Sequence, residues 1–150
     1  MTDKTDPVEI DAWRAVLRAQ AAALRAIEAD LKAHHAIPLS WYDVLLELVD
    51  ADGRRLRMAE LADRVVLSRT RVSRLVDDLV RQGYVERQPD PDDGRASFAV
   101  LTAAGAQARR HAAPVYLRGI HDHFGRHLSV RECRAVATAL TKVADGDADE

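Results

Sequence analysis

The sequence of 150 residues contains a single cysteine, Cys133, so no disulfide bond can form within the chain. Aromatic residues make up only 5% of it. No uninterrupted apolar run approaches the roughly 18 residues that read as a membrane-spanning helix, and no basic and apolar leader opens the chain. We therefore expect a cytoplasmic protein with no membrane partner, formed by one domain or by one protomer of an intertwined dimer.

The motifs of several common enzyme classes are also missing. The sequence has no glycine-rich phosphate loop, no HExxH zinc motif, no GxSxG nucleophile turn and no pair of cysteines spaced for zinc. We expect a protein that is not an enzyme, with no catalytic residues and no cofactor.

The formal net charge of −2 does not by itself indicate a partner. The local distribution is more informative, because residues 53–95 contain ten arginines and eight acidic residues, and no lysine. Arginine suits bidentate contacts to phosphate and to guanine. This segment therefore favours a nucleic-acid partner, although the chain as a whole is slightly acidic.

Long helical patterns flank this arginine-rich segment. Between residues 9 and 35, apolar residues recur every seven positions at Ile10, Leu17, Leu24 and Leu31. A second helix is expected from Thr102 to about residue 124, and a capping box of Ser129 and Glu132 predicts a third. The apolar stripe of that last helix comprises Cys133, Val136, Leu140 and Val143. A small domain cannot cover this much apolar surface, so we predict a homodimer with 1–36 and 102–150 as its helical dimerisation region.

The intervening residues 37–101 have the order of a winged helix-turn-helix. Ser40 is a predicted N-cap for a helix over 41–51, and a short strand is expected at 54–57. Helices are then predicted over 58–65 and, capped by Ser68, from 69 to about 82, where Gly83 ends the second. The core face of that second helix has the spacing i, i+3, i+4, i+7 and comprises Val72, Leu75, Val76 and Leu79.

Two strands are predicted next, over 84–88 and 97–101, with the turn-rich sequence PDPDDGR between them. Together they form a β-wing. The expected fold class is mainly α with a small β-wing, that is, a winged helix-turn-helix with N- and C-terminal dimerisation helices.

The start of the second helix is the strongest candidate for reading DNA. Short polar and cationic side chains on the first two turns of a recognition helix can reach base edges in the major groove, and the helix N-terminus favours phosphate. An ordinary solvated helix face is the alternative interpretation. The candidate residues are Ser68, Arg69, Thr70, Arg71, Ser73 and Arg74.

Arg95 lies near the expected tip of the wing, after Asp93 and Gly94. An arginine at a wing tip can enter the minor groove, where narrow A·T-rich DNA concentrates negative potential. Asp93 is expected to brace its guanidinium. The alternative is a local salt bridge in the turn that has no DNA partner.

The run from Leu56 to Gly105 resembles the MarR family of bacterial transcription regulators. The resemblance is carried by MAELADRVVLSRTRVSRLVDDLVRQGYVER, by the wing sequence DPDDGRA and by LTAAG after it. It implies a homodimer that binds a pseudopalindromic double-stranded DNA operator, with the second helix in the major groove and Arg95 in the minor groove. It also implies repression that is relieved by a small ligand or by oxidation. A winged-helix interaction module without specific DNA binding is the alternative, but such a module would be expected to lose these arginines.

The resemblance further implies an effector pocket between the dimerisation helices and the winged domain, bordered here by Trp13, His35, Trp41 and Asp43. Trp13 and Asp43 are similar to residues of a branch of the family that responds to urate and related purines. In that branch arginines of the winged domain also take part in binding the ligand, a role that the resemblance gives here to Arg74 or Arg87. An aromatic acid would fit such a pocket equally well. The alternative is that Trp13 belongs to the dimer core and Asp43 supports a helix start.

Cys133 and the six histidines remain to be explained. The thiol-switch branch of the family places its reactive cysteine near the start of the first helix, so Cys133, on an apolar helix face, is interpreted as a packing residue. His123 and His127 have the i, i+4 spacing of metal ligands, but no cysteine or glutamate lies in a matching position. We interpret the histidines as solvated or interface residues and predict no metal site.

Overall fold

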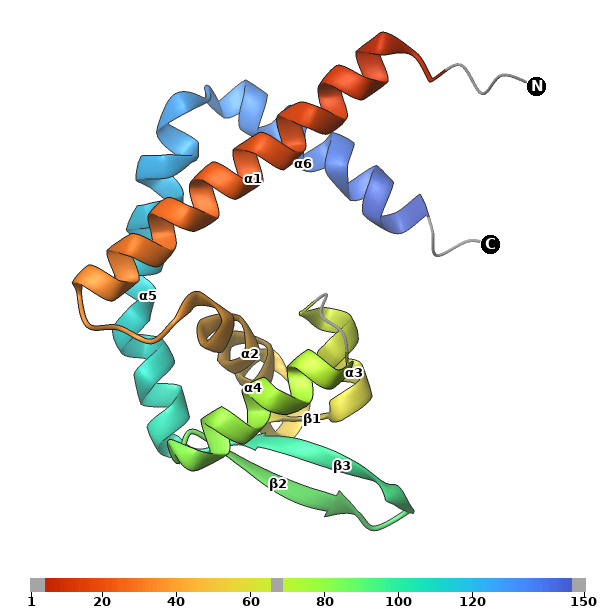
Figure 1. The fold of residues 1–150 in the computed structure, drawn as a ribbon, viewed down its shortest axis with the longest axis vertical. Helices are drawn as coiled ribbons and strands as arrows, with labels where there is room; N and C mark the ends of the chain where they lie inside the picture. Colours follow the sequence, from red (N-terminus) through yellow and green to blue (C-terminus); the bar gives the residue numbers. More distant parts are fainter. Residues whose placement is uncertain (1–4, 66–68, 147–150) are drawn as a thin grey trace. The chain divides into compact units, whose positions relative to one another are not determined.

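The computed structural model describes residues 5–65 and 69–146 (Figure 1). They form two compact units. The first, here called the winged unit, comprises residues 28–116, and the second, the helical unit, comprises the described parts of 1–27 and 117–150. Helix α1 (Pro7–Ala33) and helix α5 (Ala103–His123) each contribute to both units.

The winged unit has the predicted order of a winged helix-turn-helix. Its three strands form one antiparallel sheet in the order β1-β3-β2, and the β2–β3 hairpin extends as an arm (Figure 1). The elements between α1 and α5 are α2 (Leu39–Asp50), the 3-10 turn η1 (Asp52–Arg54), β1 (Arg55–Arg57), α3 (Met58–Arg64), α4 (Arg69–Arg81), β2 (Val85–Asp90) and β3 (Asp93–Leu101).

The core of this unit lies where α4 packs against α2, α3 and the sheet. Val72, Val76 and Leu79 of α4 are fully buried, as their spacing predicted, and Leu75 is partly buried. They share one cluster with residues of α2, of α3 and of all three strands. This burial leaves the opposite side of α4 available to solvent.

Helix α2 does not begin as predicted. The helix starts at Leu39, its N-cap residue is Pro38, and Ser40 therefore lies inside the first turn. The amide of Leu39 donates instead to the Oε2 atom of Glu28 on α1, at 2.9 Å. The capping acceptor thus comes from a residue eleven positions earlier in the chain, which a local capping rule cannot find.

Helix α4 ends at a Schellman motif, as Gly83 predicted. Gly83 has a φ of 80°, and its amide donates to the carbonyl of Val80. The amide of Tyr84 donates to the carbonyl of Leu79. The predicted N-cap of α4, Ser68, lies outside the described residues.

The wing differs from its prediction at the tip. The expected seven-residue turn PDPDDGR is wrong: β2 continues to Asp90 and β3 begins at Asp93, so only Pro91 and Asp92 form the turn. Asp90 ends the longer strand, and its buried carboxylate accepts a hydrogen bond from the amide of Asp92 and forms an ion pair with Arg57 on β1.

The start of α5 explains the LTAAG sequence. Thr102 caps the helix as predicted, since its Oγ1 accepts a hydrogen bond from the amide of Gly105 and donates to the carbonyl of Gly83. A Cβ atom at position 105 would lie 2.1 Å from the carbonyl oxygen of Tyr84. Only glycine allows α5 to approach the end of α4 this closely.

The helical unit contains the start of α1, the end of α5, the 3-10 turn η2 (Gly125–His127) and α6 (Val130–Asp145). The predicted capping box is present, with Ser129 and Glu132 each bonded to the other's backbone amide. These hydrogen bonds lower the pKa of the Glu132 carboxyl. None of the described helices is both long and apolar enough to span a bilayer.

Candidate DNA-binding surface

The first turns of α4 expose three of the predicted DNA-contacting side chains. Thr70, Arg71 and Arg74 are all exposed, and the burial of Val72 and Val76 on the opposite side fixes which face of the helix they occupy. Of the other predicted residues, Arg69 is the first helical residue, while Ser68 lies outside the described part of the chain. The structure therefore supports an exposed, cationic helix start.

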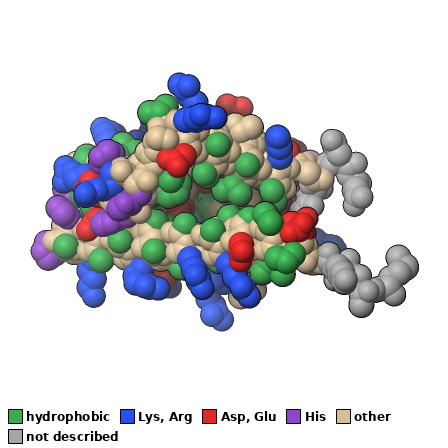
Figure 2. All heavy atoms as spheres, turned by 90° about the horizontal axis from the view of Figure 1, so that it is seen from above, with side chains coloured by type: hydrophobic (Ala, Val, Ile, Leu, Met, Phe, Trp, Pro, Cys, Tyr) green, Lys and Arg blue, Asp and Glu red, His purple; other side chains and the backbone are tan. Residues whose placement is uncertain are grey.

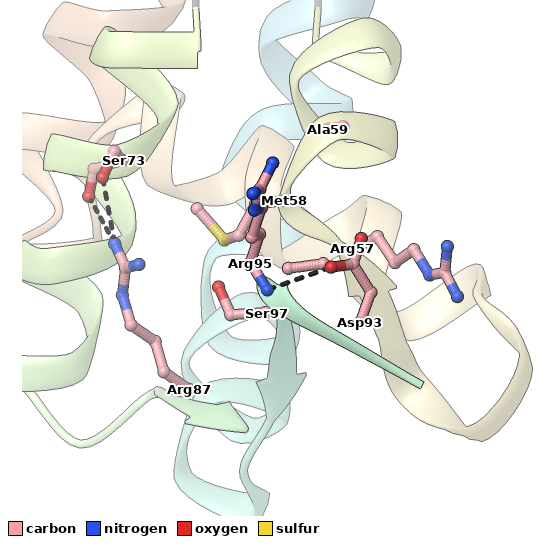
Figure 3. Close-up of a pocket in the computed structure, with 9 residues that line it drawn as sticks. Arg57, Met58, Ala59, Ser73, Arg87, Asp93, Arg95 and Ser97 are labelled. Carbon is pink, nitrogen blue, oxygen red and sulfur yellow. Dashed lines mark hydrogen bonds between the residues drawn. The ribbon is translucent and has the colours of Figure 1, made fainter. Parts of the chain in front are cut away.

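A groove of about 430 Å³ lies between this helix, the start of α3 and the wing. Three arginines from three different elements border it, one each from β1, β2 and β3 (Figure 3). Such a concave, cationic surface attracts a polyanion more strongly than the net charge of the chain suggests. The residues that line it are Arg57, Met58, Ala59, Ser73, Arg87, Asp93, Arg95, Ala96 and Ser97.

Arg95 is exposed on β3, as its predicted role requires. Asp93 holds its backbone rather than its guanidinium: Oδ1 of Asp93 accepts a hydrogen bond from the amide of Arg95 at 3.0 Å (Figure 3). No ion pair between the two side chains is found among the described residues. The local interaction thus fixes the backbone and leaves the guanidinium available to a partner.

Arg87 and Ser73 form an internal contact that the sequence did not reveal. Nη2 of Arg87 on β2 donates to both the carbonyl oxygen and Oγ of Ser73 on α4, at 3.1 Å each (Figure 3). The same nitrogen lies 2.8 Å from Oδ1 of Asp77. Arg87 was predicted to bind an effector, and Ser73 to contact DNA. In this structure the two side chains contact each other and join the wing to α4, and their predicted binding roles stay predictions.

The other predicted effector residues are divided between the two units. His35 borders a cavity of about 350 Å³ with Tyr84, Gln107 and His111. Trp41 does not line this cavity but meets Tyr84 edge to face, with ring centroids 6.2 Å apart. Trp13 belongs to the helical unit, where its side chain is 62% exposed.

Asp43 lies on α2 in a third environment. Burial raises the pKa of its carboxyl, and the nearby Glu47 and Glu28 carboxylates raise it further. Burial also raises the pKa of the Tyr116 phenol on α5, and the charge of Asp43 raises it further. A carboxyl in such surroundings gains stability from protonation or from a cationic partner.

Two further predictions concern Cys133 and the histidines. Cys133 is a free, partly buried cysteine at the edge of a shallow apolar hollow on α6. Within residues 5–65 and 69–146, no three histidine, cysteine or acidic side chains are grouped closely enough to hold a metal ion. The interpretation of Cys133 as a packing residue stays a prediction.

Sequence reasoning missed Arg57 and Asp90, which form an ion pair across the sheet. It also missed Arg55, whose guanidinium lies over the Phe98 ring at 4.4 Å from its centroid. The alternation of arginine with Leu56 in β1 is a signal for a strand with one charged face. The partner strand, however, is more than thirty residues away, so the alternation does not identify the partner.

The part of the chain that carries this surface is similar to known transcriptional regulators. Residues 37–96, which include α2 to the wing tip, match the model of the MarR family. The regulator PrsX of Escherichia coli, named an HTH-type transcriptional regulator, is 33% identical over 89 residues, which are 57% of this chain and 54% of PrsX. The HTH-type transcriptional repressor YetL of Bacillus subtilis is 30% identical over 91 residues, which are 61% of this chain and 50% of YetL. The chain thus matches only about half the length of these relatives.

The similarity to a solved structure extends much further along the chain. Sco3205 of Streptomyces coelicolor, a MarR family transcriptional regulator whose crystal structure was determined in complex with DNA, aligns with a TM-score of 0.86 at 27% identity. The alignment covers 97% of this chain and 91% of that one. The similarity therefore includes the terminal helices as well as the winged unit.

Proposed function

We propose that the chain is a member of the MarR family and a sequence-specific, DNA-binding transcriptional regulator without enzymatic activity. The observation that carries this proposal is the groove between α4 and the wing. Its recognition helix exposes Thr70, Arg71 and Arg74, and its wing exposes Arg95. A helix in the major groove together with an arginine in the adjacent minor groove would read both base edges and groove shape.

We propose that the functional form is a homodimer, with the contacts made by the helical unit. Large apolar side chains of α1 and α6 are exposed in the single chain, among them Val8 at 73%, Trp13 at 62% and Val143 at 70%. Hydrophobic side chains, drawn in green, gather on the face shown in Figure 2. Burial of such surface stabilises association at about 25 cal/mol per Å² before the costs of binding. A two-fold dimer would place two recognition helices about 34 Å apart on a pseudopalindromic operator.

We further propose that the regulator is a repressor that a small aromatic or anionic ligand releases from its operator. The name of the relative YetL supports repression. The cavity beside His35 supports a ligand, because Tyr84 offers an aromatic surface and His111 and Gln107 offer polar groups around it. The rest of the predicted effector set, Trp13, Trp41, Asp43 and Arg87, does not line this cavity.

The proposal is tested by selecting double-stranded DNA from a random-sequence pool with the full chain. Fluorescence anisotropy then compares a selected duplex with a random duplex at two salt concentrations. A specific regulator should prefer the selected duplex by roughly 10³-fold or more. Equal affinities that fall together as salt rises would indicate electrostatic attraction alone, and would favour a winged-helix interaction module. The same assay, with aromatic carboxylic acids added, tests release, and His111→Ala tests whether the cavity is responsible.

A further inference from the structure

Asp90 is the one buried charged residue in the part of the chain that the structure describes, with 4% of its surface exposed. It is the last residue of β2, directly before the turn of the wing. An acidic side chain is rarely buried at the end of an otherwise solvated hairpin, because burial disfavours the charged form unless a partner is present. The ionised carboxylate of Asp90 therefore requires partners within the fold.

The two carboxylate oxygens of Asp90 contact different elements. Oδ2 lies 2.8 Å from Nη2 of Arg57, and Oδ1 accepts a hydrogen bond from the amide of Asp92 at 2.9 Å. Arg57 is both the last residue of β1 and the N-cap residue of α3, but its side chain makes no cap hydrogen bond there. Asp90 thus links the beginning of the helix-turn-helix to the turn of the wing.

The sheet itself does not fix the direction of Arg95. Pro89 of β2 pairs with Ser97 of β3, but the next residue, Asp90, pairs with Asp93. Residues 94–96 of β3 therefore lie in a bulge, without partners on β2. Bulges re-aim side chains and depend on their surroundings for their conformation. Here Arg95 is held through its amide by Asp93, whose position depends in turn on the pairing with Asp90.

We propose that Asp90 and Arg57 form a positioning pair that sets the direction in which Arg95 leaves the wing, and so control DNA affinity without contacting DNA themselves. This inference deepens the proposed function and rests on it. The competing explanation is that Arg57, whose side chain is 48% exposed, contacts phosphate directly. The two explanations make opposite predictions for Asp90. Loss of its negative charge should strengthen binding to a polyanion if only charge matters, but should weaken binding if Asp90 positions Arg95.

The test measures Asp90→Asn and Arg57→Gln in the full chain, with a DNA duplex that the wild-type chain has selected from a random pool. We expect each variant to bind the selected duplex about tenfold more weakly, which corresponds to about 1.4 kcal/mol. In the Arg95→Ala background, each should have almost no further effect, because the arginine that it positions is gone. A purely structural role would not produce this dependence on Arg95.

Arg55→Gln is the matched control. It removes the same charge from the same strand, and both Arg55 and Arg57 place a guanidinium over the Phe98 ring, but Arg55 makes no ion pair with Asp90 among the described residues. We expect Arg55→Gln to keep the preference for selected over random DNA. Thermal unfolding by circular dichroism verifies that each variant folds. Tighter or unchanged binding by Asp90→Asn, or losses that add to that of Arg95→Ala, would overturn the inference.

Hydrogen exchange without DNA separates this inference from the proposed function. Asp90→Asn should accelerate exchange of the amides of Asp92 and Arg95, whatever the chain binds. If the wild-type chain enriches no DNA sequence, the regulator proposal fails, while the exchange result still decides whether Asp90 orders the wing. Unchanged exchange at both amides would contradict the positioning pair directly.

Discussion

A single nitrogen of Arg87 donates hydrogen bonds to both the carbonyl oxygen and the hydroxyl oxygen of Ser73. This contact joins β2 of the wing to the fifth residue of α4. The orientation of the wing relative to the recognition helix is therefore set by side chains as well as by the sheet. Ser73, which the sequence marked for DNA contact, is used for this internal contact.

Replacement of Arg87 should consequently loosen the wing. Arg87→Met removes the guanidinium but keeps an unbranched stem, and we expect it to lower the free energy of unfolding by about 1 kcal/mol, with the partly exposed ion pair to Asp77 adding little. Chemical denaturation measures the change. Gln88→Met, at the next and exposed strand position, is the control; an equal loss there would show that the contact with Ser73 is unimportant.

Arg95→Ala should weaken binding to a selected DNA duplex and leave the dimer intact. The guanidinium is exposed and is not paired with Asp93, so its removal affects the partner and not the fold. A minor-groove arginine of this kind is expected to contribute about 1–3 kcal/mol. Anisotropy measures affinity, and light scattering measures the oligomeric state. Unchanged affinity would remove Arg95 from the DNA-binding surface.

Arg71→Ala should reduce specific binding more than nonspecific binding. Its side chain is exposed at the third residue of α4, in the first turn, where a recognition helix meets base edges. Loss of a base contact lowers affinity for the preferred sequence by about 1–3 kcal/mol, while loss of a phosphate contact weakens all sequences alike. Titrations with selected and random duplexes distinguish the two. Equal losses on both would identify Arg71 as a phosphate contact.

Gly105→Ala should destabilise the winged unit. The added Cβ would lie 2.1 Å from the backbone oxygen of Tyr84, which cannot move independently of the end of α4. We expect a loss of about 1–3 kcal/mol, as for other overpacked sites. Gly94→Ala is the matched control, because a Cβ there meets no atom within 4 Å. Thermal denaturation that ranks the two variants equally would contradict this explanation of LTAAG.

Asp43→Asn should stabilise the protein at neutral pH. Burial and the neighbouring Glu47 and Glu28 raise the pKa of Asp43 above 3.8 in the folded chain. Ionisation of Asp43 therefore lowers the stability of the folded chain. This loss is absent below the ordinary pKa of 3.8, grows as the pH rises above it, and is complete above the raised pKa of the folded chain. We expect Asp43→Asn to raise the Tm by about 1–4 °C near neutral pH and to leave it nearly unchanged in acid. A benefit of the same size at both pH values would exclude titration of Asp43 as its cause.

Much of the fold could be predicted from local patterns. The apolar spacing in α4 identified its buried face, Gly83 identified its end, and Thr102 and Ser129 identified the starts of α5 and α6, since each signal depends on atoms within about one helical turn. The exposed face of α4 and Arg95 followed from the same patterns. Ser40 was wrong as a cap because Glu28, from a different helix, supplies the acceptor.

Sequence by itself therefore determined the order of helices and strands, the buried face of α4 and the exposed arginines of α4 and of the wing. Only the tertiary structure decided which of the polar side chains are used internally. Arg87 with Ser73, and Arg57 with Asp90, are brought together by the pairing of distant strands and by the packing of α4 against the sheet. Such contacts have no local periodicity, because they depend on the three-dimensional proximity of segments far apart in the chain.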